Sequence, residues 1–285
     1  MRTGFLVVVL ALLGAALAAA QAPVIDPTRT GENGASFVQG QAVAPGSLVT
    51  IFGNNFSSST AVFSTVPISN TLAGVSVTVN NLPAPMVQVV SKSSFPGLQS
   101  DQVSVQLPWA GLPAGTATGS ASVVVSTATG GASAPVTIPL SSISPGLFRI
   151  FTDSTGVNRP AAYNNSDISL PLPPSIQVPG YTSRPSKPGE VLVLWATGLG
   201  PVTNQPADGS PGLGQSPFSA TTTTPVVLVG GVQATIVYSV LSPQYPSMYQ
   251  IAITVPNVPP GNVVPLQIQM NGVTTTNTNQ IAIGQ

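Results

Sequence analysis

The strongest constraint on the fold is an internal repeat. Three landmarks recur in the same order: residues 44–53 (APGSLVTIFG) as 187–196 (KPGEVLVLWA), residues 102–108 (QVSVQLP) as 250–256 (QIAITVP), and a Pro-x-Gly turn at 113–115 as one at 259–261. The period is roughly 145 residues, whereas solenoid repeats span about 20–50 residues. The chain is therefore predicted to contain two copies of one domain, with Gly46 and Gly189 in equivalent turns.

Each copy consists of short strand-like segments. Val103, Val105 and Leu107 alternate with polar residues, which is typical of a strand with one buried face. Clusters of Gly, Pro and Asn separate the segments, and no window has a helical period. The expected strands are residues 48–52, 75–79, 86–90, 103–107, 121–125 and 136–140, then 191–195, 226–229, 234–240, 251–255, 265–270 and 281–283. This pattern predicts an all-β fold of two tandem immunoglobulin-like β-sandwich domains.

The N-terminus and the segment between the copies set the expected domain limits. Residues 1–20 comprise a basic residue, an apolar run and three alanines, which is the pattern of a signal peptide with cleavage before Gln21. An uncleaved membrane anchor is the alternative, although the apolar run is short for a span. The two domains are expected at residues 21–148 and 186–285. Residues 149–185, rich in Pro, Ser and Asn, are expected to form a linker or a packed excursion, and their aromatic residues favour partial packing on one domain.

Export and charge limit the partners. The signal peptide predicts an extracellular or cell-surface protein, with the periplasm as another compartment, and no transmembrane segment is expected after its removal. The formal net charge is zero, from 7 basic and 7 acidic residues, and no basic stripe suggests nucleic acid. Near-zero charge permits self-association. The expected partner is therefore an extracellular protein or a polysaccharide.

Residue types on which many enzymes depend are missing. Without His and Cys, the chain cannot build a Ser-His-Asp triad, a Cys-His pair or the usual zinc site. The acidic residues are scattered in predicted turns, and an enzyme would need two of them to converge in a cleft. No catalytic residue, cofactor or metal is predicted. A calcium site is the alternative in two oxygen-rich groups, Asp153 with Asn158, and Asn164 with Asn165 and Asp167.

Aromatic residues are the remaining candidates for ligand contact. Five aromatic residues fall in or beside predicted loops, namely Tyr163, Tyr181, Phe218, Tyr245 and Tyr249, and the four tyrosines among them are the predicted ligand contacts. Loops on rigid sandwiches often carry recognition, and a sugar ring could stack on such side chains. Trp109 and Trp195 are instead expected in a sandwich core or at its rim, because they bury a large apolar area.

Several motifs together resemble a known family. They are residues 33–37 (NGASF), 43–53 (VAPGSLVTIFG), 105–109 (VQLPW), 144–148 (SPGLF), 188–191 (PGEV) and 196–202 (ATGLGPV). The ordered set is similar to the Solibacter-type uncharacterised C-terminal domain of secreted bacterial proteins. The halves also resemble, more loosely, the IPT/TIG immunoglobulin-like domains of plexins and certain transcription factors. The resemblance implies the fold and export, and it transfers no catalytic or binding residue.

Two functional hypotheses follow. The first is a secreted or cell-surface, non-catalytic interaction or structural module of unknown ligand, for which strand addition at a sheet edge is one route. The alternative is a carbohydrate-binding module that acts on extracellular polysaccharide. The alternative requires the loop aromatics to line up on one exposed face, so the placement of the tyrosines tests it.

Overall fold

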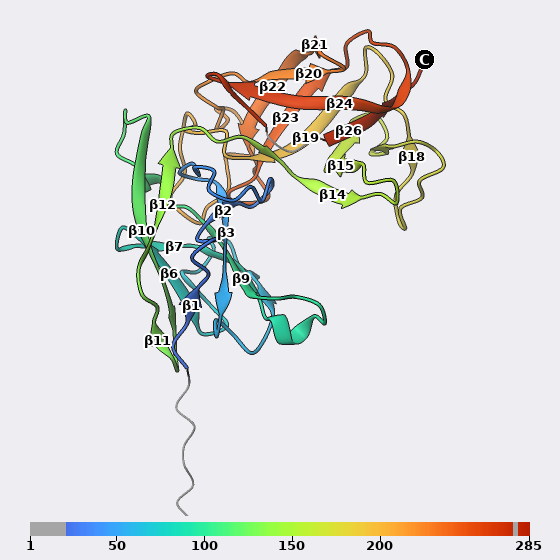
Figure 1. Cartoon of the computed structure of the whole chain (residues 1–285). Coiled ribbons are helices and arrows are strands. Elements are labelled where there is room, and N and C mark those ends of the chain that lie inside the picture. The colour runs from blue at the N-terminus through green and yellow to red at the C-terminus, as the bar shows by residue number, and fades with distance from the viewer. Residues whose placement is uncertain (1–20, 276–278) are drawn as a thin grey trace, which may run out of the picture.

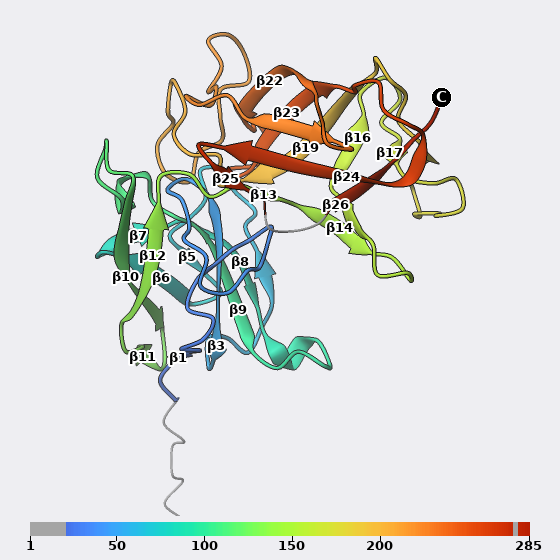
Figure 2. The ribbon, with the colours of Figure 1, turned by 45° about the horizontal axis from the view of Figure 1, so that its top comes forward.

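The computed structural model describes residues 21–275 and 279–285, and the predicted signal peptide, residues 1–20, lies outside the described residues. The chain forms two β-sandwich units, one from each half of the sequence (Figures 1 and 2). Each unit has its own apolar core. The described helices of the chain are two 3-10 turns in the first unit, η1 (Lys92–Ser94) and η2 (Trp109–Gly111). Within the described ranges, no helix has the length and apolar character of a membrane span.

The first unit packs two sheets against each other. One contains β1 (Val24–Ile25), β3 (Leu48–Asn54), β9 (Asp101–Gln106), β8 (Met86–Val90) and β4 (Ala61–Val62) in that order, with β2 (Glu32–Asn33) on β3. The other contains β11 (Gly131–Ala132), β10 (Thr118–Thr127), β6 (Val75–Val79) and β5 (Thr71–Leu72), with β12 (Val136–Ser141) on β10 and β7 (Leu82–Ala84) on β6. Alternate residues of β6, β9 and β10 fill the core between the sheets.

The second unit repeats this architecture. One sheet contains β13 (Gly146–Leu147), β19 (Val191–Thr197), β23 (Tyr249–Thr254) and β22 (Thr235–Leu241), with β16 (Ala162–Asn164) on β19. The other contains β14 (Arg149–Thr152), β15 (Asn158–Pro160), β26 (Asn279–Ile283), β24 (Gly261–Met270), β20 (Val226–Val229) and β21 (Val232–Gln233), with β25 (Val273–Thr274) on β24. A small separate pair joins β17 (Leu170–Pro171) to β18 (Ser183–Arg184). Each strand segment predicted from the sequence overlaps an observed strand, so the all-β tandem sandwich is confirmed.

The duplicated glycines occupy equivalent turns. The amide of Gly46 donates to the carbonyl of Leu107 at 2.8 Å, and the amide of Gly189 donates to the carbonyl of Val255 at 2.9 Å. Both glycines have a positive φ, 75° and 85°, which a residue with a Cβ adopts only under strain. Leu107 and Val255 are themselves a repeated pair in the sequence. The two copies are therefore the same fold, as the repeat predicts.

Residues 149–185 contribute strands to the second unit. β14 and β15 extend one sheet, and β16 pairs with β19. The chain enters this unit before residue 148, the predicted end of the first domain. Ile143 and Leu147 already lie in the second core, because β13 pairs with β19.

Polar side chains and glycines of the family-like motifs meet where the two units join. The side-chain amide of Asn33 donates to the carbonyl of Ser144 at 2.8 Å, and the amide of Ser144 donates to the carbonyl of Gly198 at 2.8 Å. The amide of Leu48 in the first unit donates to the hydroxyl of Thr197 in the second at 2.9 Å. Both side chains, Asn33 and Thr197, are fully buried. The motifs thus build the junction rather than a ligand site.

Candidate binding surface

One sheet of the second unit gathers aromatic side chains on its outward face. In β19 and β23 the side chains of Leu192, Leu194 and Ile251 point into the core, so the alternate residues face away from it. Directly paired residues form a row across four strands: Tyr163, Val193, Ala252 and Tyr238. Val193 and Ala252 are fully buried although they face outward. The two tyrosines therefore stand at the ends of a row whose centre is buried.

A second row and two loops complete the surface. Trp195 pairs with Gln250 in the next outward row. Tyr245, from the loop before β23, meets the indole of Trp195 edge to face, with ring centroids 5.6 Å apart. Tyr181, which is 57% exposed, lies between β17 and β18 and lines a shallow pocket of about 340 Å³ together with Tyr163 and Trp195. We call the surface formed by Tyr163, Tyr181, Trp195, Tyr238 and Tyr245 the aromatic face.

The structure brings together three of the four predicted contact tyrosines, Tyr163, Tyr181 and Tyr245. Tyr249 needs a correction. Its side chain is fully buried in the second core, and its hydroxyl donates to the carbonyl of Gly200 at 2.6 Å. Burial raises the pKa of this hydroxyl far above its ordinary value. Tyr249 begins β23 with its side chain inward, so it offers no surface to a ligand.

Two members of the aromatic face were missed from the sequence. Trp195, expected in a core or at its rim, is partly buried on the outward face. Strand alternation contained the signal, since an inward Leu194 turns Trp195 outward. Tyr238 was not identifiable in this way, because a register shift between Ile236 and Tyr238 interrupts the alternation of β22.

The aromatic face carries no formal charge. Burial raises the pKa of Tyr163, and the pKa of Tyr238 is raised by burial and then by the neighbouring Tyr163. Both phenols are therefore protonated at neutral pH. No Asp, Glu, Lys or Arg lines the pocket, and two exposed aliphatic residues, Ile150 and Ile168, extend its rim.

The equivalent row of the first unit is polar. It consists of Glu32, Thr50, Ser104 and Gln88, and the sheet has its register shift at the same place, between Met86 and Gln88. The hydroxyls of Thr50 and Ser104 lie 2.9 Å apart and share a hydrogen bond. The positions of the two tyrosines are thus taken by Glu32 and Gln88. Duplication has produced two copies of one surface with different chemistry.

The first copy also covers the position that corresponds to Trp195. This position is Phe52, and the guanidinium of Arg29 lies 3.4 Å from the centre of its ring. The same Arg29 forms an ion pair with Glu32 at 2.7 Å. Phe37 packs edge to face against Phe52, with ring centroids 6.3 Å apart. The first copy therefore closes this face with its own side chains, and Phe52 is buried.

The edge of the aromatic sheet is less suited to strand addition. The segment that contains Ser219 and Thr221 runs beside the end of β22. The amide of Leu241 donates to the carbonyl of Ser219 at 2.8 Å, and the amide of Thr221 donates to the carbonyl of Ser239 at 3.0 Å. The register shift interrupts the remaining part of the strand. Because bulges and covering segments block regular edge pairing, this edge is a poor site for strand addition.

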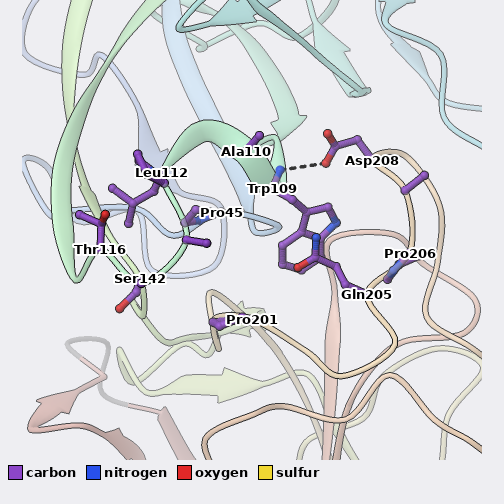
Figure 3. A pocket seen from close by; sticks show the side chains of 14 residues that line it. Pro45, Trp109, Ala110, Leu112, Thr116, Ser142, Pro201, Gln205, Pro206 and Asp208 are labelled. Atoms are coloured by element: carbon purple, nitrogen blue, oxygen red, sulfur yellow. Dashed lines mark hydrogen bonds between the residues drawn. The ribbon is translucent and has the colours of Figure 1, made fainter.

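A larger pocket, of about 560 Å³, lies between the units (Figure 3). Its wall includes Trp109, whose backbone amide donates to the carboxylate of Asp208 at 2.9 Å across the junction. Desolvation raises the pKa of Asp208, and the hydrogen bond from Trp109 partly opposes this shift. The Trp109 indole covers Gly46 so closely that an added Cβ there would lie 2.1 Å from the ring, and it also packs against the second core. Trp109 therefore couples the units, in agreement with its expected packing role.

The acidic residues that suggested calcium bind arginine instead. Asp153 pairs with Arg159 at 2.8 Å, and Asp167 pairs with Arg184 at 2.7 Å. A side-chain hydrogen bond from Thr155 is the largest cause of the strongly lowered pKa of Asp153, and Arg184 has the same effect on Asp167. Over residues 21–275 and 279–285, no three acidic side chains gather in a way that could hold a metal ion. Two ion pairs therefore occupy the carboxylates on which the calcium alternative depended.

Comparison with known proteins adds little to this description. No family model matches the chain, and no curated protein matches it. Among solved structures, SGBP-B of a Bacteroides ovatus mixed-linkage glucan utilization locus, in complex with a mixed-linkage heptasaccharide, aligns with a TM-score of 0.32 and 10% identity over 91% of this chain and 47% of that one. The I9–I11 tandem of titin aligns with a TM-score of 0.21 and 11% identity over 92% of this chain and 66% of that one. The D00–D0 domain of intimin aligns with a TM-score of 0.20 and 11% identity over 90% of this chain and 99% of that one. The chain thus spans less than two thirds of the first two proteins, and the similarity is too low to carry a functional argument.

Proposed function

We propose that the protein is a non-catalytic, extracellular or cell-surface binding module whose ligand lies on the aromatic face. The observation that carries this proposal is the convergence of Tyr163, Tyr181, Trp195, Tyr238 and Tyr245 on the outward face of one sheet. These residues come from three strands and two loops that are distant in the sequence. Aromatic side chains exposed together on a rigid sheet are suited to recognition, because they offer a large contact area with little loss of conformational entropy.

The comparison between the two copies supports the proposal. Both copies need the same inward residues for their cores, but stability does not require an aromatic outward row. The first copy folds with Glu32, Thr50, Ser104 and Gln88 at those positions. The row of the second copy instead has aromatic residues at its two ends: Tyr163 is partly exposed and Tyr238 is 36% exposed. Exposed apolar surface of this kind is unfavourable unless a ligand covers it.

A catalytic role has less support. Glycoside hydrolysis, for example, requires two carboxyl groups that face the same bond. Asp153, Asp167 and Glu190 are held by Arg159 or Arg184, and Glu32 is held by Arg29. Asp208 caps η2 through the amide of Trp109, away from the aromatic face. These five acids therefore contribute to structure, and none of them belongs to the aromatic face.

Cosedimentation with cells and shed extracellular polymer of the producing organism tests the proposal. The mature chain is compared with Tyr238→Gln, which introduces the residue of the first copy, and with Tyr245→Ala. Phe218→Ala is the matched control, because Phe218 is 50% exposed in the same unit but does not line the pocket between Tyr163, Tyr181 and Trp195. We expect both face variants to lose at least about tenfold in bound fraction and the control to bind normally. Equal binding of all four proteins would refute the proposal.

A further inference from the structure

We infer that the ligand of the aromatic face is a neutral, linear polysaccharide, bound lengthwise across the sheet. This inference rests on the proposed function and specifies its ligand class. Three properties of the face lead to it: the absence of charge, the combination of flat rings with hydroxyl groups, and its length.

The absence of charge excludes most ionic ligands. An acidic polymer would require Lys or Arg in the contact surface, and a basic peptide would require Asp or Glu. The pocket between Tyr163, Tyr181 and Trp195 is lined by neither. In the first copy, by contrast, the equivalent row contains Glu32, whose carboxylate forms an ion pair with the guanidinium of Arg29 at 2.7 Å. The second copy lacks both charges at these positions, so a neutral ligand fits it best.

The side chains match the two sides of a sugar ring. The C–H groups on one face of a pyranose are weakly positive and can lie on the negative face of an aromatic ring. Its hydroxyls then reach outward to hydrogen-bonding groups at the edge. Tyr163 and Tyr238 supply phenol hydroxyls, and partly exposed Gln250 supplies an amide beside Trp195. Alternating apolar and hydrogen-bonding contacts of this kind are what an uncharged polyhydroxylated chain requires.

The length of the face indicates a chain rather than a single sugar. Tyr163 and Tyr238 stand on the outer two of four neighbouring strands, so their backbones are about 14 Å apart at the usual strand spacing of about 4.8 Å. Tyr181 and Tyr245 extend the surface on the loops. The pocket of about 340 Å³ is open at the surface and could take one ring of a longer chain. A polymer can therefore pass over the face without presenting an end.

The test uses native affinity electrophoresis and titration calorimetry with the mature chain. The probes are hydroxyethyl cellulose and galactomannan, which are neutral, and polygalacturonate, which is acidic. We expect retardation by at least one neutral polymer and none by polygalacturonate. Binding to the neutral polymer should change less than about twofold between low and high salt, since no ion pair is screened. Tyr238→Gln and Tyr245→Ala should bind at least about tenfold more weakly, and Phe218→Ala should bind as the parent does.

Thermal unfolding of each variant shows whether the fold is intact, and Tyr238→Gln is the most informative change because the first copy already contains Gln88 at this position. If no neutral polymer binds while the face variants still lose cosedimentation with cells, the ligand class is wrong and the binding face stands. A protein partner is then the occupant. If polygalacturonate binds better than the neutral polymers, the inference is likewise overturned. If the parent protein binds neither a neutral polymer nor the cells and extracellular polymer of the cosedimentation experiment, the proposed function is rejected as well.

Discussion

The ring of Tyr245 meets the indole of Trp195 edge to face, with centroids 5.6 Å apart and ring planes at 69°. Tyr245 is 46% exposed, and Trp195 is partly buried. Aromatic pairs of this geometry contribute about 0.5–1.5 kcal/mol beyond their buried area. We therefore expect Tyr245→Ala to lower the free energy of unfolding by about 1 kcal/mol and to shift tryptophan emission to longer wavelength. Phe218→Ala should leave the emission maximum unchanged, and an unchanged maximum in both variants would contradict the contact.

The hydroxyl of Thr197 links the two units. It accepts a hydrogen bond from the amide of Leu48 at 2.9 Å and donates to the carbonyl of Ser247 at 2.7 Å. Thr197→Val keeps the shape but leaves both backbone groups unpaired, which costs about 1–3 kcal/mol for a buried group. Urea unfolding should show this loss, whereas Thr129→Val at an exposed position should change stability little. A difference below about 0.5 kcal/mol between the variants would show that the junction does not depend on this hydroxyl.

Val105 and Ile253 are equivalent core residues of the two copies, and both are at most 1% exposed. An aspartate at either position would bury an unpaired carboxylate, a change that costs several kcal/mol. We expect Val105→Asp to unfold the first unit, and Ile253→Asp to unfold the second. Val62→Asp, at a position that is 55% exposed, is the matched control and should keep the parent melting temperature. A parent-like melting temperature for Val105→Asp would show that Val105 does not lie on the buried face of its strand.

Gly198 has no room for a side chain. Its φ is 75°, and an added Cβ would lie 1.9 Å from the carbonyl oxygen of Ser144. Gly180 has a similar φ of 82° but open space around it. Both Gly→Ala variants incur the strain of positive φ, about 1–2 kcal/mol, so their difference isolates the clash at the junction. Denaturant titration should show Gly198→Ala to be the less stable by more than about 1 kcal/mol, and equal stability would contradict the close approach.

The pH dependence of the aromatic face follows from its phenols. Burial raises the pKa of Tyr163 and Tyr238, so both stay neutral below their ordinary pKa of about 10. Ligand affinity should therefore be constant between about pH 5 and pH 9. A raised folded-state pKa stabilises the fold below the unfolded pKa, and this contribution disappears as pH rises through the folded pKa. Melting curves above about pH 10 should show this loss in the parent, and Tyr238→Phe should reduce it.

Much of the fold follows from local pattern. The alternation of apolar and polar residues predicted strands β9 and β23, and the structure contains both. The internal repeat predicted equivalent turns at Gly46 and Gly189, and both glycines have a positive φ. These features depend on neighbouring residues along the chain and on which side of a strand faces the core. The end of the first domain was less predictable, because β13 pairs with a strand that lies about 50 residues later, a distance at which local periodicity carries no information.

The candidate site shows the same division. The sequence singled out Tyr163, Tyr181 and Tyr245 as ligand contacts, since they lie in or beside loops, but the same argument included Tyr249. Tyr249 and Tyr245 are separated by three residues. Tyr249 is the first residue of β23 and points into the core, whereas Tyr245 lies in the preceding loop and contacts Trp195. Proximity in sequence does not determine the direction of a side chain at a loop end.

The sequence by itself determined the strands, the duplication and the absence of His and Cys, because these depend on composition and on short-range order. Only the tertiary structure decided that Tyr163, Tyr238 and Trp195 share one face, since pairing of β16, β19, β23 and β22 joins residues far apart in the chain. It also decided that the family-like motifs form the junction and that Arg29 closes the equivalent face of the first copy. Long-range hydrogen bonding sets these relationships, and no local pattern encodes them.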